Sequence, residues 1–312
     1  MLVCLAMLVA VGCPLAVPRA GGPGDRLAGP GRSLAWVADG AAPVRSWAVG
    51  TAEFTFVRAG RTLRTQVLYP AGGPGDGAPK AGAPVAPGRF PLVLWSHGLH
   101  AVPEGYEPFT AKLAAAGFVV AAPAYPFTNG RAARFDAGDM PNQPADAAFV
   151  ISRILDPGTP LAGHLDAGRV GAAGHSAGGY TTAGLLSGPD RDARLRAGII
   201  VAGGDVVAGE SLPGPFSGAA TPVLFVHGDR DDTVPYANGR RLYESCAWPK
   251  GFVTVSGGDH NAALLSPGPA GDAVDRTMLD FLRYALYDDA AARRRLRPDA
   301  TAPSTVQYDG TL

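Results

Sequence analysis

The sequence contains few cysteines and has no excess of charge of either sign. There are 3 cysteines in 312 residues, and 27 Lys and Arg residues balance 27 Asp and Glu residues. Without a basic excess we expect no nucleic-acid partner, and without an acidic excess we expect no solvating tail. Cys4 and Cys13 lie in the first 13 residues, so an exported form would retain only Cys246. That form would have no intramolecular disulfide and no metal site built from cysteines.

The apolar stretch at the N-terminus is too short to cross a bilayer. Residues 1–13 (MLVCLAMLVAVGC) have the length of the hydrophobic part of a secretory signal. Residues 10–13 resemble a lipobox that would attach lipid to Cys13, Pro18-Arg19-Ala20 offers an ordinary cleavage site, and a membrane tether is a further alternative. We expect residues 1–20 to be a signal segment, and the mature protein to be secreted or held at the cell envelope through Cys13, without a stable membrane span.

The remaining composition is that of a globular protein. Hydrophobic residues make up 46% of the chain and charged residues 17%, and 312 residues suffice for one large domain or two small ones. Residues 21–46 and 71–89 are rich in Gly, Pro and Ala, which predicts a flexible segment and a long surface loop. We therefore expect one folded domain over residues 47–290, followed by a C-terminal tail over residues 291–312.

Apolar runs and helical spacings alternate from residue 52 onward. Strands are expected at residues 53–58, 62–69, 91–96, 118–122, 169–173, 198–202, 223–226 and 252–255. Helices are expected at residues 109–117, 147–154, 180–186 and 274–285. This alternation predicts an α/β fold, with a mostly parallel central sheet, helices on both faces and an antiparallel pair of strands at the N-terminal edge.

The stretch GAAGHSAGGY at residues 171–180 places Ser176 between a predicted strand and a predicted helix. A tight turn there would expose the hydroxyl, and glycine at 174 and 178 would avoid clashes beside it. The helix N-terminus would direct backbone N–H groups at a ligand next to the serine. The alternative is a plain turn in a glycine-rich protein, but the position between strand and helix favours a nucleophile.

A serine nucleophile needs a base, and the base needs a carboxylate that orients it. The segment HGDRDDTVP follows one strand at residues 227–235, and SGGDH follows the next strand at residues 256–260. Both would lie at the carboxyl edge of a parallel sheet, beside the serine. We take His260 as the base, and the residues alone leave Asp229, Asp231 and Asp232 as candidate acids.

Five short motifs carry a family resemblance: SHG at 96–98, NQPAD at 142–146, GHSAGG at 174–179, the HG and VP pairs within 227–235, and GDH at 258–260. With the order Ser, Asp, His, residues 52–286 resemble an α/β-hydrolase, and within that superfamily the dienelactone-hydrolase-like and platelet-activating-factor-acetylhydrolase-like serine esterases. The resemblance implies Asp231 as the acid, four residues before the proline. Asp205 is the other candidate, because some lipases place the acid there. Serine in place of the cysteine of dienelactone hydrolase favours ordinary esters.

The oxyanion hole and the substrate pocket can also be predicted. The backbone N–H groups of Leu99 and Ala177 are the expected donors to the oxyanion. The pocket is expected to be lined by His100, Tyr106, Tyr125, Phe127, His175 and Trp248, with plain packing as the alternative for the aromatic residues. His97 is expected to hydrogen-bond nearby backbone, and His227 to hydrogen-bond the turn that carries Asp231. No metal-ligand spacing is present, so we expect no metal and no cofactor.

The expected function is hydrolysis of small or polymeric carboxylic esters through an acyl-enzyme. Alternatives with the same fold are a cutinase-like polyester hydrolase, a phospholipid acetyl-ester hydrolase, a peptidase and an acyltransferase. The alternative of another class is an inactive α/β-hydrolase that serves as a binding module. Residues 203–221 are too few for a large lid, which favours an open site. We expect a monomer.

Overall fold

The computed structural model describes residues 41–73, 75, 78–212, 214–262, 264, 267–301 and 304–312. The predicted signal segment, Cys13 and the predicted flexible segment up to residue 40 lie outside the described residues. Within the described ranges, no helix is both long and apolar enough to cross a membrane.

The main elements alternate between strands and helices, as predicted. The strands are β1 Ala48–Arg58, β2 Arg61–Ala71, β3 Lys80–Ala81, β4 Phe90–Ser96, β5 Val119–Ala124, β6 Leu165–His175, β7 Leu195–Val201, β8 Val206–Val207, β9 Glu210–Ser211, β10 Val223–Gly228, β11 Lys250–Val255 and β12 Val306–Gly310. The α-helices are α1 Glu107–Ala115, α2 Gln143–Ile154, α3 Ala177–Leu185, α4 Tyr236–Ser245, α5 Pro269–Tyr287 and α6 Ala290–Thr301. Short 3₁₀ turns span Pro103–Tyr106, Ala137–Asn142 and Ala162–His164.

A ten-stranded sheet runs through the described part of the chain, in the order β12-β11-β10-β7-β6-β4-β5-β2-β1-β3. The six central strands, from β11 to β5, are parallel. Strand β2 is antiparallel to β5, and β1 is antiparallel to β2, which confirms the antiparallel pair predicted at the N-terminal edge. The central strands are mostly apolar because both faces of the sheet are covered.

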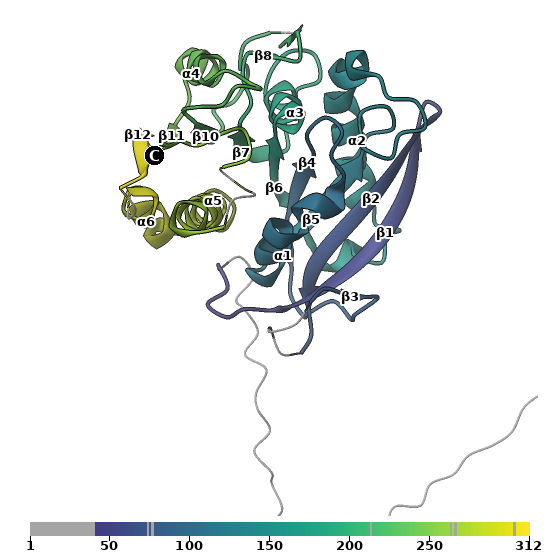
Figure 1. Ribbon diagram of the computed structural model, residues 1–312. Helices are drawn as coiled ribbons and strands as arrows, with labels where there is room; N and C mark the ends of the chain where they lie inside the picture. The colour runs from purple at the N-terminus through teal and green to yellow at the C-terminus, as the bar shows by residue number, and fades with distance from the viewer. Residues whose placement is uncertain are drawn as a thin grey trace, which may run out of the picture. The chain divides into compact units, whose positions relative to one another are not determined.

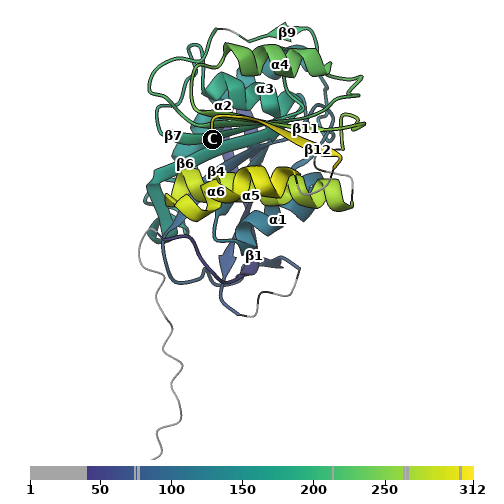
Figure 2. The same ribbon diagram turned by 90° about the vertical axis from the view of Figure 1, so that its left-hand side faces the viewer.

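Helices cover both faces of this sheet (Figure 1). Figure 2 shows α2, α3 and α4 on one side of the strands and α1, α5 and α6 on the other. Each layer has its own core: one contains Phe109 of α1 with Phe281 of α5, and the other contains Ile151 of α2 with Leu242 of α4. This is the arrangement predicted from the alternation of elements, a sheet with helices on both faces.

The chain changes direction across the sheet at β4. It runs from β4 through α1 to the neighbouring β5, and then through α2 to β6 on the other side of β4. Connections leaving β4 and β6 therefore diverge to opposite faces and leave a crevice at the carboxyl ends of these two strands. Open α/β sheets bind their ligands at such a point.

The prediction of a C-terminal tail over residues 291–312 is wrong. Residues Ala290–Thr301 form α6, which packs on α5 with Leu296 buried, and β12 extends the sheet antiparallel to β11. Val306 and Tyr308 of β12 are buried at 3% and 7% exposure. The folded domain thus extends to the C-terminal residues. The loop predicted at 71–89 also contains a short strand, β3, parallel to β1.

Candidate active site

Ser176 lies at the sharp turn between β6 and α3, where the sequence predicts a nucleophile. Its φ of 58° and ψ of −119° are unusual for a residue other than glycine. Its N–H donates to the Val201 carbonyl at 2.8 Å, which ties the turn to β7. A Cβ at residue 174 would overlap the Gly178 carbonyl, and a Cβ at residue 178 would overlap the Ser96 carbonyl. Glycine at both positions is therefore required by the close approach of backbone.

Asp231 and His260 form a direct pair. His260 Nδ1 lies 2.7 Å from Asp231 Oδ2, and the Asp231 side chain is fully buried. The other carboxylate oxygen accepts hydrogen bonds from the N–H groups of Thr233 at 2.9 Å and Val234 at 2.8 Å. Burial alone would raise the pKa of Asp231, but hydrogen bonds from His227, His260 and the Val234 N–H outweigh it and hold this pKa well below its usual range. Asp231 is therefore a charged acceptor fixed in orientation.

His227 supports this carboxylate, as predicted. Its Nε2 lies 2.9 Å from the Val234 carbonyl and 3.1 Å from Asp231 Oδ2. Because both neighbours are acceptors, Nε2 carries the ring proton. His227 thus donates a hydrogen bond to Asp231 Oδ2, the oxygen that also accepts the hydrogen bond from His260.

The other candidate acids point elsewhere. Asp205 forms a bidentate ion pair with Arg241, at 2.8 and 3.0 Å. Asp229 is exposed and accepts the Gly257 N–H at 2.6 Å, and Asp232 is also exposed. Among these candidates in the described chain, Asp231 is the one in contact with His260.

A hydrogen-bond chain joins the loop after β4 to the loop that carries His260. The Gly98 N–H donates to the Tyr106 hydroxyl at 3.1 Å, and this hydroxyl lies 3.0 Å from His175 Nδ1. His175 Nε2 lies 2.9 Å from the His260 carbonyl, so Nε2 donates and Nδ1 accepts from Tyr106. Burial lowers the pKa of His175 to about 4, which keeps its ring neutral at pH 7. Sequence reasoning placed Tyr106 in the pocket but missed this connection.

His97 is also held by backbone, as predicted. Its Nδ1 lies 2.7 Å from the Gly98 carbonyl and its Nε2 accepts the Tyr125 N–H at 3.1 Å. Burial lowers its pKa to about 4. The ring fixes the loop after β4 against the end of β5.

The NQPAD motif ties α2 to its surroundings. The Gln143 amide donates to Thr128 Oγ1 at 2.7 Å and its carbonyl accepts from Thr181 of α3. Asp146, whose side chain is fully buried, pairs with Arg61 at 2.7 Å. The motif therefore links α3 and the loop after β5, and it does not reach the cavity beside Ser176.

Ser176 and His260 open onto one cavity of about 320 Å³. Leu99 also lines it, and Ala177 directly follows the serine at the start of α3. Neither the Leu99 N–H nor the Ala177 N–H donates to another described residue, so both remain available to a ligand. No Arg, Lys, Asp or Glu is among the described residues that line this cavity: Gly98, Leu99, His100, Ala101, Val102, Gly105, Tyr106, His175, Ser176, His260 and Asn261.

Half of the residues predicted for the pocket line this cavity: His100, Tyr106 and His175. The prediction needs correction for the other three. Tyr125 is fully buried and its hydroxyl bonds Ser96 Oγ at 2.8 Å, Phe127 lies 5.3 Å from the Arg61 guanidinium, and Trp248 packs on Phe216. Sequence position near a strand end does not reveal the direction of a side chain. Phe135, which stacks on His100, was missed because its loop has no periodic pattern.

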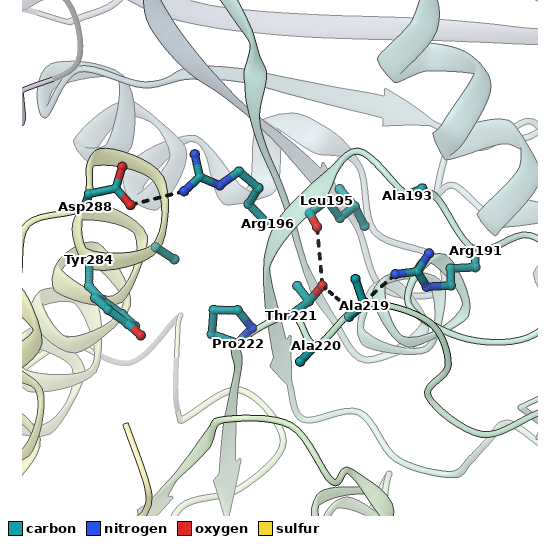
Figure 3. A pocket seen from close by; sticks show the side chains of 11 residues that line it. Arg191, Ala193, Leu195, Arg196, Ala219, Ala220, Thr221, Pro222, Tyr284 and Asp288 are labelled. Atoms are coloured by element: carbon teal, nitrogen blue, oxygen red, sulfur yellow. Dashed lines mark hydrogen bonds and ion pairs between the residues drawn. The ribbon is translucent and has the colours of Figure 1, made fainter.

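A second cavity, of about 390 Å³, lies at the amino ends of the central strands, away from Ser176 (Figure 3). It lies beside Leu195 and Pro222, where β7 and β10 begin, and Arg191, Arg196 and Tyr284 face it. Arg196 is paired with Asp288, and Arg191 donates to the Ala219 carbonyl. None of the residues predicted for catalysis is among the described residues that line it. The described residues also contain no cluster of His, Cys, Asp or Glu suited to a metal ion.

Comparisons with known proteins agree with this fold. The sequence model of the family described as platelet-activating factor acetylhydrolase, isoform II, matches residues 64–128, which include the loop after β4 but not Ser176, Asp231 or His260. No curated protein matches the chain. A ferulic acid esterase from Streptomyces cinnamoneus superposes with a TM-score of 0.67 and 20% identity, over 86% of this chain and 97% of that one. The chain has the α/β-hydrolase fold that its motifs predicted.

Proposed function

We propose that this protein hydrolyses carboxylic esters, with Ser176 as nucleophile, His260 as general base and Asp231 as the orienting acid. The observation that carries the proposal is the 2.7 Å pair of His260 and Asp231, in which His260 lines the same cavity as Ser176, a serine with positive φ at a strand-to-helix turn. The family and the solved structure reported above are named as an acetylhydrolase and an esterase, which supports the same class.

The contacts of His260 support the following proton steps. Asp231 holds the Nδ1–H of His260, so Nε2 is the basic nitrogen and takes the proton of Ser176 Oγ as this oxygen attacks the ester carbonyl. The N–H groups of Leu99 and Ala177 then stabilise the oxyanion. When the bond to the alcohol oxygen breaks, His260 returns the proton to the leaving alcohol. A water molecule repeats the sequence and releases the acid from Ser176.

The competing functions make different demands on the site. An inactive binding module would have no need of the Asp231–His260 pair or of the unusual backbone at Ser176. A phospholipid acetyl-ester hydrolase would need a group that recognises a charged headgroup, and no Arg, Lys, Asp or Glu lines the cavity within the described chain. Polyester hydrolysis, peptidase activity and acyl transfer use the same triad, and substrate assays distinguish them from simple ester hydrolysis.

Hydrolysis of p-nitrophenyl acetate by the purified protein tests the proposal. Ser176→Ala should lower kcat/KM by about 10⁴-fold or more with little change in Tm, because the side chain lies at a turn and not in the core. Ser217→Ala, a change at an exposed serine, is the matched control and should keep full activity. The proposal fails if Ser176→Ala keeps a tenth of the activity, or if dialysis against EDTA removes the activity and zinc restores it.

A further inference from the structure

One ring that lines the catalytic cavity, that of His100, stacks on a second ring, that of Phe135. The ring centroids of His100 and Phe135 are 3.5 Å apart and their planes differ by 14°. His100 is exposed and lines the cavity together with Ser176 and His260. Phe135 is 37% exposed, which makes it one of few large hydrophobic side chains so exposed in the described chain. We call His100 and Phe135 the ring platform.

The backbone holds His100 in this place despite its conformational preference. Its φ of 58° lies in the left-handed region, which residues other than glycine rarely adopt. The His100 N–H donates to the Thr128 carbonyl at 2.9 Å, and the Gly130 N–H donates to the Ala101 carbonyl at 2.9 Å. Gly130 approaches the His100 carbonyl so closely that a Cβ there would clash. Strain that a fold maintains next to a reacting group is a reason to look for a function.

No Arg, Lys, Asp or Glu lies among the described residues that line the cavity beside the platform. Apolar Leu99, Ala101 and Val102 neighbour His100, and among the described lining residues the titratable side chains are Tyr106, His175, His260 and His100 itself. A volume of about 320 Å³ is enough for a small ligand group. A charged group on the substrate would find no partner of opposite charge, whereas a planar ring would find a flat surface of matching shape.

We infer that the ring platform selects esters whose acyl group is a neutral aromatic ring. The ring would stack on His100, backed by Phe135, while the ester carbonyl lies at Ser176 Oγ. This inference rests on the proposed function, because it names the substrate class of the same site. Straight acyl chains and charged headgroups would gain nothing from the platform.

Two esters with the same carbon skeleton test the inference: ethyl benzoate, which has a planar ring, and ethyl cyclohexanecarboxylate, which has a puckered one. We expect kcat/KM, divided by the alkaline hydrolysis rate of each ester, to be roughly fivefold to tenfold higher for the planar ester. Ring stacking corresponds to roughly a twofold to tenfold effect. His100→Asn should therefore lower the preference about fivefold, mainly through KM, because asparagine tolerates the left-handed backbone but has no ring.

Phe135→Leu removes the backing ring without touching the cavity lining, and it should lower the preference in part. Val57→Ala, at another exposed hydrophobic side chain, is the control and should keep the wild-type preference. The inference is overturned if wild type treats the two rings alike, if both platform variants retain the preference, or if an acetyl ester with a phosphocholine headgroup is a better substrate. In those cases turnover persists and the proposed function stands. Absence of any ester turnover would overturn both.

Discussion

The acid of the triad is the residue whose role the structure distinguishes most clearly. One oxygen of Asp231 is occupied by two backbone N–H donors, so the other must face His260. In Asp231→Asn the amide oxygen would take the backbone donors and the NH₂ would face His260, which would force Nδ1 to accept and shift the ring proton to Nε2. We predict a loss of about 10⁴-fold in kcat for a p-nitrophenyl ester.

Asp205→Asn and Asp229→Asn are the controls for this prediction. Asp205 is bound to Arg241 and Asp229 to the Gly257 N–H, so neither change alters the tautomer of His260. Each variant should stay within about threefold of wild type. A larger loss at Asp205 than at Asp231 would overturn the assignment of the acid.

Tyr106 is a positioning residue. Its hydroxyl is hydrogen-bonded to the Gly98 N–H and to His175 Nδ1, and not to Ser176 or to the ring of His260. Tyr106→Phe would leave the Gly98 N–H and His175 Nδ1 without their partner, at a cost of about 1–3 kcal/mol in stability. The freed loop would misplace the Leu99 N–H. We predict a tenfold to hundredfold decrease in kcat with KM within about twofold. A loss of stability with unchanged kcat would show a purely structural role.

At the scale of elements, the turn between β6 and α3 depends on close backbone contact with the end of β4. A Cβ at residue 178 would overlap the Ser96 carbonyl. Neither this carbonyl nor the backbone of residue 178 can move away easily, because both belong to packed elements. Gly178→Ala should therefore lower the free energy of unfolding by about 3 kcal/mol or more, and activity should fall with it. Thermal unfolding gives the measurement.

Gly163→Ala is the matched control, because a Cβ at Gly163 meets no atom within 4 Å. Its free energy of unfolding should stay within about 0.5 kcal/mol of wild type. Equal effects of the two substitutions would mean that the contact at the turn does not limit the fold.

Elements differ in how far their residues reveal them. Most residues of the parallel strands β4, β7 and β10 are buried, so these strands appear in the sequence as short apolar runs. In β12 the only signal in the sequence is the alternation of Val306 and Tyr308 with polar residues. Helix α6 contains five charged residues in twelve. Both segments therefore resembled a polar tail. These two segments fold in spite of their weak local patterns because α6 packs on α5 and β12 pairs with the edge of β11.

At the scale of the whole molecule, the meeting of distant loops is what residues alone could not predict. The positions of Ser176 and His260 followed from strand ends, but the choice among Asp229, Asp231 and Asp232 required a family resemblance. The chain His175–Tyr106–Gly98 and the stack of His100 on Phe135 depend on how three loops approach at the switch point, which no spacing along the chain encodes.

The two buried histidines should make the stability of the whole protein sensitive to mild acid. Burial lowers the pKa of His97 and of His175 to about 4, whereas an unfolded histidine has a pKa of about 6.5. Between these values the unfolded chain binds protons that the folded protein does not, so the free energy of unfolding falls as the pH is lowered through this window. Each histidine contributes up to about 3 kcal/mol.

Denaturant titrations at pH 7 and pH 4.5 measure this loss. His175→Gln, which cannot be protonated, should show a smaller loss of stability between the two pH values than wild type. A free energy of unfolding that is the same at both pH values would contradict burial of these rings in the neutral form.

The role of Ser176 as the nucleophile activated by His260 can be tested by covalent labelling. The purified protein is treated with a fluorophosphonate and digested, and the label is located by mass spectrometry. We expect one label per chain, on Ser176, with labelling abolished in Ser176→Ala and slowed by at least about a thousandfold in His260→Ala. If the protein takes no label, or carries the label on another residue, Ser176 is not the nucleophile.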